Sequence, residues 1–264
     1  LCLIYFSFFK KINFQKFKIF LILCLSSPVL FFDNLEPIDY SWAFVFFALG
    51  TFFLSRRIFE LAILAFAFAI GSRINFLIFS IIVIFFFNYD KEINIKKKFI
   101  ISFCTFIVGG LFYLPIWFEN AFGLEWITAA RPVEQGLYGL FARFAFKTWM
   151  AIGVFQTFLI IFLIKKYIKR VNYIEVKPIF LVIISNLLIF FYIPAELSYL
   201  QPALILMYLV IVKEVNKNLI ILLIIFNFFN WALNFQILDI NYKDNSVCGP
   251  KEAVIALAYK LKTS

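Results

Sequence analysis

The chain has 264 residues, of which 64% are hydrophobic and 22% aromatic, and its formal net charge is +10 at neutral pH. Soluble domains are typically about 45–50% apolar, so this composition argues against a water-soluble fold. The absence of histidine excludes Ser-His-Asp and Cys-His catalysis, histidine-ligated zinc and haem with a proximal histidine.

Apolar residues come in runs of roughly 14–20, close to the length at which a helix crosses about 30 Å of hydrocarbon. In lipid, only a helix satisfies its own backbone hydrogen bonds over such a run. We therefore predict an all-α protein, a polytopic bundle of transmembrane helices with short outer-face loops and one longer interfacial outer segment. The predicted spans, in chain order, are Leu1–Phe9, Ile19–Phe32, Tyr40–Leu54, Ile58–Ile70, Ile74–Phe87, Phe99–Leu114, Trp149–Ile164, Ile179–Ile193, Leu197–Val212 and Leu219–Phe235.

These spans form one predicted transmembrane domain, residues 1–235, which includes the outer segment 115–148. Residues 236–264 are predicted to be a short extracytoplasmic tail that could form an amphipathic helix. The chain begins with Leu and with half of a span, so we expect a fragment whose preceding spans and outer loop are absent. In a signal peptide the charges precede the apolar run, whereas here the run Leu1–Phe9 precedes the basic residues that begin at Lys10, so a signal peptide is not predicted.

Basic residues fall mainly on one side of the predicted membrane when the loops are assigned alternately. That side collects 17 of the 25 Lys and Arg residues, whereas the other side holds ten of the fifteen acids. Cytoplasmic loops carry an excess of Lys and Arg, so we predict a multi-pass protein of the bacterial cytoplasmic membrane with this side inside. The 17 residues are Lys10, Lys11, Lys16, Lys18, Arg56, Arg57, Lys91, Lys96, Lys97, Lys98, Lys165, Lys166, Lys169, Arg170, Lys177, Lys213 and Lys217.

This topology accounts for the positive net charge, so membrane lipids, and not nucleic acid, are the predicted partners of the basic residues. Three of the four cysteines lie inside apolar runs, and Cys248 is alone in the tail. Because this spacing suits neither a metal site nor a disulfide, neither is predicted from them. No glycine-rich phosphate loop occurs, so no nucleotide cofactor is predicted.

Polar residues on the predicted outer face are the candidates for a functional site. The stretch FFDNLEPIDYSWAF places Asp33, Glu36 and Asp39 in one short outer loop. These acids either follow the charge bias of the topology alone or bind a cation, a sugar hydroxyl or an acceptor amine.

In AIGSRINFLIF, Arg73 lies between two short apolar runs. A charge at a helix centre costs about 2.5–3.5 kcal/mol on insertion scales, so Arg73 is predicted either to anchor the helix at the interface or to bind a lipid-linked phosphate.

Two further outer segments carry candidate residues. In FYIPAELSYLQPALILMYL, a tight turn places Glu196 before a span that begins near Tyr199. Glu196 either caps that helix or shapes a substrate pocket.

The segment Pro115–Thr148, which includes Arg131, is too polar to span the membrane and too aromatic for a free linker. We predict that it forms an interfacial helix and a loop that covers the substrate.

The run from Ser27 to Phe87 resembles the second half of the GT-C superfamily of membrane glycosyltransferases, particularly the dolichyl-phosphate-mannose-protein mannosyltransferase-like and RgtA/B/C/D-like group. The matching positions are Pro37 and Asp39 in the outer loop, Arg56 and Arg57 at a helix end, and Arg73 at the final basic position, although Arg73 follows Gly71 at a shorter spacing. Later in the chain, the start of a span is similar to that of the family at Glu196, Tyr199, Leu200 and Pro202.

This resemblance implies transfer of a sugar from a polyprenyl-phosphate carrier to an acceptor at the outer face. On this basis we predict that Arg73 binds the donor phosphate and that Asp39, Glu196 and Tyr199 bind substrate or shape the site. Asp33, Glu36 and Arg131, as polar residues of the predicted outer face, are further candidates for substrate binding or for the shape of the site. The family's acidic catalytic motif would lie upstream of Leu1, so the catalytic residues are unknown and the fragment alone is expected to be inactive. No metal-binding residue is predicted, although outer carboxylates could position a divalent cation.

Two alternatives remain at this point. A transporter or flippase of a lipid-linked sugar would favour ionisable residues in mid-span and interrupted helices, whereas the charges here cluster at the ends of the predicted spans. A polymerase or ligase of the O-antigen type is close to the glycosyltransferase in mechanism. The donor sugar and the acceptor are not predicted.

Overall fold

The computed structural model describes residues 1–8, 13–30, 39–87, 93–119, 137–153, 156–158, 160–162, 173–193 and 197–242. All regular structure within these ranges is helical, so the all-α prediction is confirmed for them. None of the described helices combines the length and the apolar character needed to cross a membrane. The helices are α1 (Cys2–Phe8), α2 (Phe14–Ser26), α4 (Asp39–Ser55), α5 (Phe59–Ser72), α6 (Phe76–Phe86), α7 (Ile95–Leu111), α8 (Leu114–Glu119), α10 (Leu137–Ile152), α12 (Tyr173–Tyr192), the 3₁₀ turn η1 (Leu197–Leu200), α13 (Gln201–Glu214) and α14 (Lys217–Tyr242).

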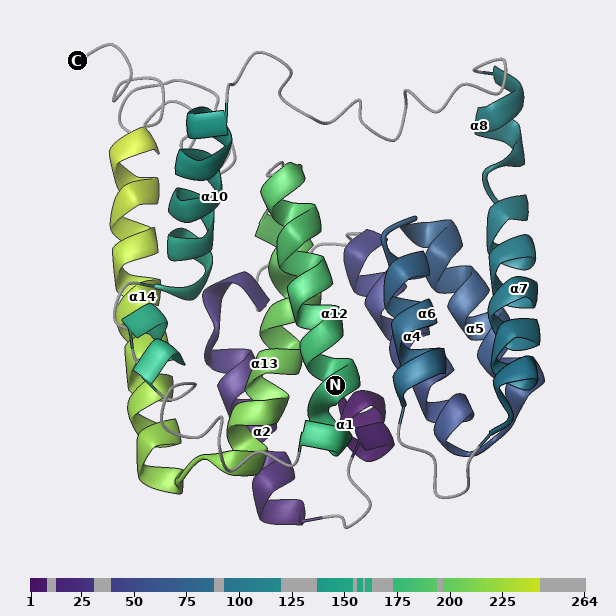
Figure 1. Ribbon diagram of the computed structural model, residues 1–264. Helices are drawn as coiled ribbons and strands as arrows, with labels where there is room; N and C mark the ends of the chain where they lie inside the picture. The colour runs from purple at the N-terminus through teal and green to yellow at the C-terminus, as the bar shows by residue number, and fades with distance from the viewer. Residues whose placement is uncertain are drawn as a thin grey trace.

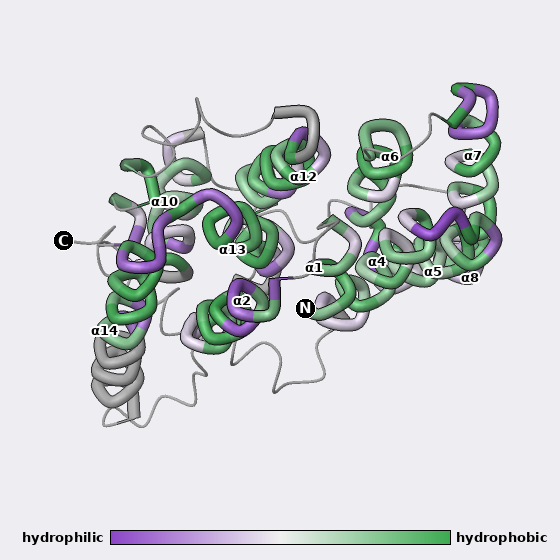
Figure 2. Tube along the Cα trace, turned by 90° about the horizontal axis from the view of Figure 1, so that it is seen from below, coloured by the Kyte–Doolittle hydropathy of each residue, from purple (hydrophilic) through white to green (hydrophobic). Residues whose placement is uncertain are grey.

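The helices lie side by side along one common direction and form two groups (Figures 1 and 2). In the first group, α5 packs between α4 and α7, and α6 completes the layer. In the second group, α13 packs against α2 and α12, and α10 and α14 lie at the outer edge. Contacts of α12 with α6 and of α1 with α4 join the two groups into one bundle.

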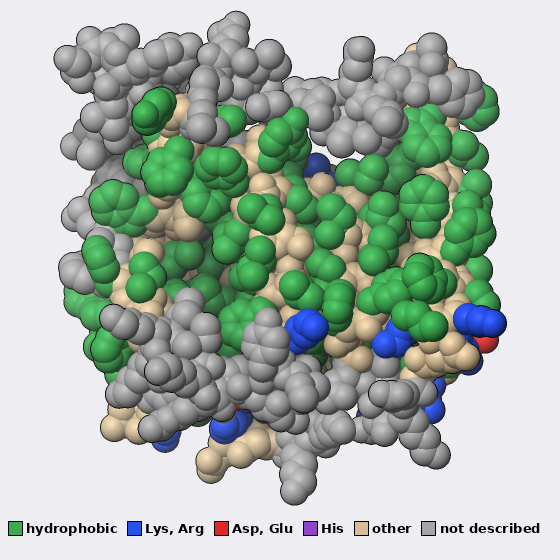
Figure 3. Space-filling model, viewed as in Figure 1, with side chains coloured by type: hydrophobic (Ala, Val, Ile, Leu, Met, Phe, Trp, Pro, Cys, Tyr) green, Lys and Arg blue, Asp and Glu red, His purple; other side chains and the backbone are tan. Residues whose placement is uncertain are grey.

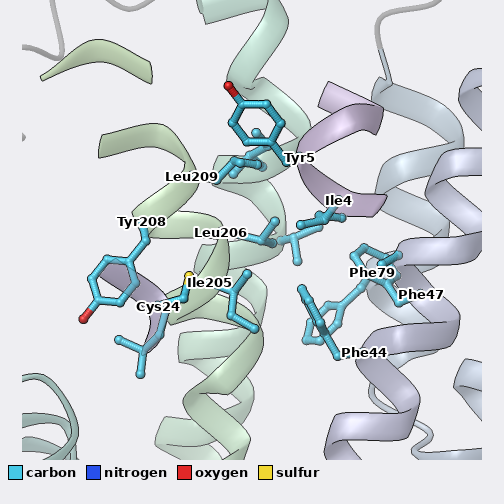
Figure 4. Packing of buried hydrophobic residues seen from close by; sticks show 14 of the residues in the cluster. Ile4, Tyr5, Cys24, Phe44, Phe47, Phe79, Ile205, Leu206, Tyr208 and Leu209 are labelled. Carbon is cyan, nitrogen blue, oxygen red and sulfur yellow. The ribbon is translucent and has the colours of Figure 1, made fainter. Parts of the chain in front are cut away.

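The buried core runs through the junction between the two groups (Figure 4). Ile4 of α1 lies between Leu206 of α13 and the aromatic side chains of α4 and α6, among them Phe47 and Phe79. These side chains are almost fully buried, and Phe47 and Phe79 stack edge to face with their ring centroids 6.3 Å apart. The short α1 therefore fills the space between the groups.

Small residues allow close contact among α4, α5 and α7. A Cβ atom added to Gly50 of α4 would lie 2.5 Å from the ring of Phe66 on α5, and one added to Gly109 of α7 would lie 2.9 Å from Ile70. Small residues at helix interfaces let backbones approach closely, which is a common packing mode where lipid surrounds the helices.

The prediction of a single span from Trp149 to Ile164 is wrong. Trp149 lies near the end of α10, which begins at Leu137 inside the predicted outer segment and ends at Ile152. Gly153 then adopts a left-handed conformation, with φ at +88°, and interrupts the helix. Lys147 belongs to the segment that was predicted to lie at the outer interface, yet its side chain is buried within the bundle.

The predicted span Ile19–Phe32 is also interrupted. α2 begins at Phe14, where the side chain of Asn13 accepts a hydrogen bond from the backbone N–H of Lys16, and it ends at Ser26. Ser27 is extended because a residue that precedes a proline is sterically disfavoured from helical geometry. Residues 28–30 are again helical.

At the C-terminal end, α14 continues to Tyr242, beyond the predicted span end at Phe235 and into the predicted tail. The rest of that tail, residues 243–264, lies outside the described residues.

Candidate functional site

Most of the described Lys and Arg residues gather at one end of the bundle. Lys16 Nζ of α2 donates to the carbonyl oxygen of Lys213 at the end of α13, at 2.8 Å. Figure 3 shows the Lys and Arg side chains of one face mainly along the lower margin of its hydrophobic surface. This single basic end agrees with the alternation of the loops. Its residues are Lys16, Lys18, Arg56, Arg57, Lys96, Lys97, Lys98, Lys177, Lys213 and Lys217.

Arg73 lies at the opposite end, in the turn between α5 and α6. It is the C-cap of α5, and its extended backbone donates to the carbonyl oxygen of Ala69 at 3.0 Å. Its own carbonyl oxygen accepts from the N–H of Phe76, which opens α6, at 3.1 Å. The backbone of Arg73 is therefore fixed by both helices, and its side chain starts from a defined position.

The guanidinium of Arg73 packs against two tyrosine rings that come from distant parts of the chain. Its Cζ lies 4.3 Å from the ring centroid of Tyr40, in the first turn of α4, and 5.8 Å from that of Tyr199, in η1. The two ring centroids are 4.5 Å apart. Tyr40 is 1% exposed and Tyr199 is 8% exposed. A cation held against desolvated aromatic faces gains electrostatic attraction from the rings and is fixed in orientation.

Polar side chains complete this cluster. Asn75 Nδ2, in the turn before α6, donates to the hydroxyl oxygen of Tyr40 at 3.2 Å. Gln201 Nε2, the first residue of α13, donates to the hydroxyl oxygen of Ser41 on α4 at 3.3 Å. The site at this end therefore joins the start of α4, the α5–α6 turn and the start of α13.

The structure brings together two of the residues predicted from sequence, Arg73 and Tyr199, although 126 positions separate them. Asp39 is the first residue of α4, directly before Tyr40, and its side chain is outside the described set. The other predicted site residues, Asp33, Glu36, Arg131 and Glu196, all lie outside the described residues.

Three members of the cluster were not predicted as site residues, namely Tyr40, Asn75 and Gln201. Each lies within two positions of a residue that the sequence analysis had named: Tyr40 follows Asp39, Asn75 is two positions after Arg73, and Gln201 precedes Pro202. The only sign in the sequence that these residues belong to the cluster was therefore their closeness to the motif residues. Only the fold shows that the faces of Tyr40 and Tyr199 point to the same guanidinium.

A second polar cluster lies deep inside the bundle. Gln156 Nε2, just after the break at Gly153, donates to Asn227 Oδ1 of α14 at 3.3 Å. Asn227 Nδ2 donates to the hydroxyl oxygen of Ser26 at the end of α2, at 2.9 Å. Asn227 is ten positions beyond Lys217, so it lies about 15 Å from the basic end, near mid-depth. The two helix interruptions therefore meet at one buried network.

Within the described ranges, no three His, Cys, Asp or Glu residues come together in a way that could hold a metal ion. Comparison of the chain with protein-family models, with curated proteins and with solved structures gives no match.

Proposed function

We propose that the chain is part of an integral membrane glycosyltransferase that transfers a sugar from a polyprenyl-phosphate carrier to an acceptor at the outer face of the cytoplasmic membrane. The observation that carries this proposal is the guanidinium of Arg73, held by Tyr40 and Tyr199 at the end of the bundle opposite the basic residues. Two stretches that resemble the same enzyme family, residues 27–87 and 196–202, contribute to this one cluster.

The exposed hydrophobic surface supports a membrane location. Figure 3 displays it as a broad band, and α7 exposes large apolar side chains along its whole length, including Phe99, Phe103 and Leu111. Phe103, near the middle of that helix, is 66% exposed. Soluble monomers rarely expose contiguous apolar patches of this extent, whereas hydrocarbon chains would cover them without cost.

Several of the helices are short for a bilayer. α4 and α7 have 17 residues each, roughly 26 Å, against a hydrocarbon core of about 30 Å. Local thinning of the bilayer and lysine side chains that extend to the interface accommodate a mismatch of this size. The lysines at the basic end are suitably placed for this purpose.

The geometry of Arg73 suits a phosphate ligand. A guanidinium can donate two parallel hydrogen bonds to the oxygens of one phosphate. The same charge would stabilise the phosphate as it leaves the sugar. Proton removal from the acceptor requires a nearby carboxylate.

A transporter or flippase of a lipid-linked sugar is the second candidate. The break at Gly153 and the network of Gln156, Asn227 and Ser26 near mid-depth favour it, since transporters often build their binding sites from interrupted helices at this level. The two candidates differ in outcome. A transporter moves the lipid-linked sugar intact, whereas a glycosyltransferase releases polyprenyl phosphate.

The test is an assay of sugar transfer from radiolabelled polyprenyl-phosphate-sugar by the full-length gene product in membranes, at matched expression. Arg73→Ala should lower transfer roughly 100-fold or more, because the guanidinium that stabilises the negative charge on the leaving phosphate is lost. Arg73→Lys keeps the charge but loses the paired geometry, so it should lower transfer roughly tenfold.

Arg56 provides the matched control. Its guanidinium also lies over a ring, 5.5 Å from the centroid of Phe52, but at the basic end. Arg56→Ala should leave transfer near the wild-type rate. Wild-type transfer by Arg73→Ala would refute the assignment, and transmembrane movement of intact donor without release of polyprenyl phosphate would favour the transporter.

A further inference from the structure

The end of α7 packs closely against the last turn of α5, directly before the turn that carries Arg73. Phe112, the C-cap of α7, lies over Gly71 of α5, where an added Cβ atom would be 2.6 Å from the Phe112 ring. The Phe112 ring also contacts that of Phe68, with the two centroids 5.5 Å apart. Figures 1 and 2 show α5 and α7 side by side. The two helix ends are therefore in direct contact two positions before Arg73.

The next residue, Tyr113, forms a hydrogen bond at this contact. Its hydroxyl donates to the carbonyl oxygen of Ile70 at 2.6 Å, and both residues are buried. In a continued helix, the N–H of Ile74 would donate to this carbonyl oxygen. Arg73 is extended, with φ at −153° and ψ at 120°, so α5 ends before it. The hydroxyl of Tyr113 thus supplies a hydrogen bond to a carbonyl group at the end of α5.

The extended backbone of Arg73 determines where its side chain points. In this conformation its Cζ lies 4.3 Å from the ring centroid of Tyr40. If α5 continued through Arg73, the side chain would leave the helix in another direction. The hydroxyl of Tyr113 stabilises the ended helix, because it provides the hydrogen bond that a further helical turn would otherwise supply.

We propose that Tyr113 is a positioning residue for the donor phosphate: by donating to Ile70, it keeps Arg73 in the extended conformation that places the guanidinium against Tyr40. The identity of the ligand rests on the proposed function, whereas the effect of Tyr113 on the α5–α6 turn does not. Tyr113 acts through Arg73 in this proposal and not by contact with the donor.

The first measurement is the donor dependence of sugar transfer by the full-length protein in membranes. Tyr113→Phe keeps the ring and removes the hydroxyl, so it should raise the KM for the donor roughly 3- to 10-fold and leave the KM for the acceptor unchanged. Tyr5→Phe is the matched control. It removes a hydroxyl that also donates to a backbone carbonyl oxygen, that of Asn13 at 3.2 Å, and should leave the donor KM unchanged.

A double variant separates positioning from a general structural role. In the Arg73→Ala background, Tyr113→Phe should change kcat/KM for the donor by less than about twofold, since the side chain that it positions is already absent. A loss as large as that in the wild-type background would show that Tyr113 acts independently of Arg73, and would overturn the proposal.

A pair of glycine variants tests the same contact by another route. Gly71→Ala introduces a Cβ atom against Phe112, so it should separate the two helix ends and also raise the donor KM. Gly110→Ala is the control on α7, because an added Cβ there has no atom within 4 Å, and it should behave as the wild type. An equal effect of both substitutions would contradict the proposal. If Gly71→Ala fails to accumulate in membranes, Tyr113→Phe alone decides.

A second measurement does not depend on the proposed function. Hydrogen exchange of the purified full-length protein, followed by mass spectrometry, reports the opening of the turn at residues 70–76. Tyr113→Phe should speed exchange there, whereas Tyr5→Phe should not. A wild type that transfers no sugar refutes the proposed function, while the exchange still decides whether Tyr113 fixes the turn. An unchanged donor KM in an active enzyme, or unchanged exchange at the turn, overturns this inference alone.

Discussion

The ring of Tyr40 contacts both Arg73 and the ring of Tyr199, and its hydroxyl oxygen accepts from Asn75. Three of its neighbours therefore come from three different helix ends. At 1% exposure, this tyrosine has no access to a large ligand, so in the proposed site we assign it the role of positioning the guanidinium. A role of this kind depends on the aromatic face and much less on the hydroxyl group.

Tyr40→Leu should raise the KM for the polyprenyl-phosphate donor about 2- to 30-fold, because the cation loses a ring worth roughly 0.5–2 kcal/mol. Tyr40→Phe keeps that face and should stay within about threefold of the wild type. The measurement is the donor dependence of transfer by the full-length enzyme in membranes.

Tyr5→Leu serves as the control for the loss of a buried ring, since Tyr5 is also 1% exposed but lies in α1, away from Arg73. It should lower thermal stability and leave the donor KM unchanged. A similar KM increase in Tyr40→Phe and Tyr40→Leu would mean that the hydroxyl group, and not the ring, carries the effect.

At the scale of helices, the interruptions at Gly153 and Ser27 expose a limit of sequence reasoning. Gly153 occurs in an apolar run that continues to Ile164, and nothing in the hydrophobic pattern marks a break there. Its left-handed φ is a conformation that glycine adopts without steric cost. An added Cβ would lie 2.1 Å from Gln156 Oε1, so the break and the polar network depend on each other.

Asn227→Leu should destabilise the bundle by about 1–3 kcal/mol, because it leaves the buried side chains of Gln156 and Ser26 without one of their hydrogen-bond partners. The measurement is thermal unfolding of the purified full-length protein in detergent. Asn218→Leu, at the exposed start of the same helix, should change stability by about 0.5 kcal/mol or less.

Coupling between the two amides gives a stricter test of the network. Once Asn227 is replaced by Leu, the Gln156 side chain has already lost this partner. A further Gln156→Leu substitution should therefore lower the stability less than the same substitution does in the wild type. Strictly additive losses would contradict a shared network.

At the scale of the whole molecule, the sequence predicted helices and their ends well where one apolar run corresponds to one helix. The predicted span Tyr40–Leu54 corresponds to α4 at Asp39–Ser55, and Ile74–Phe87 corresponds to α6 at Phe76–Phe86. The sorting of basic residues onto one side corresponds to the single basic end. Such features follow from local hydrophobicity and from the alternation of charges, which need no knowledge of packing.

Features that depend on packing between distant segments were not predictable in this way. Lys147 is buried on α10, although it belongs to the segment predicted to lie at the outer interface, because its environment is set by other helices. For the same reason, the sequence proposed Arg73 and Tyr199 as separate candidates but could not place them beside each other. The contact between them follows from the way α13 packs against α4.

The central claim is that the bundle lies in a membrane with its basic end in the cytoplasm and its Arg73 end outside. α7 and α8 together extend from the basic end of the bundle to the opposite end. They offer three exposed positions: Lys97 at the basic end, Phe103 in the hydrophobic band and Glu119 at the opposite end. Single cysteines at these positions, in a full-length protein whose native cysteines are replaced by alanine, can be tested with a membrane-impermeant maleimide.

In intact cells the reagent should label Glu119→Cys, whereas Lys97→Cys should react only after the cells are permeabilised. Phe103→Cys should resist labelling in both conditions, although its side chain is highly exposed on the bare protein, because hydrocarbon excludes the aqueous reagent; it should react once detergent has denatured the protein. Labelling of Lys97→Cys in intact cells, or of Phe103→Cys in permeabilised cells, would contradict the account.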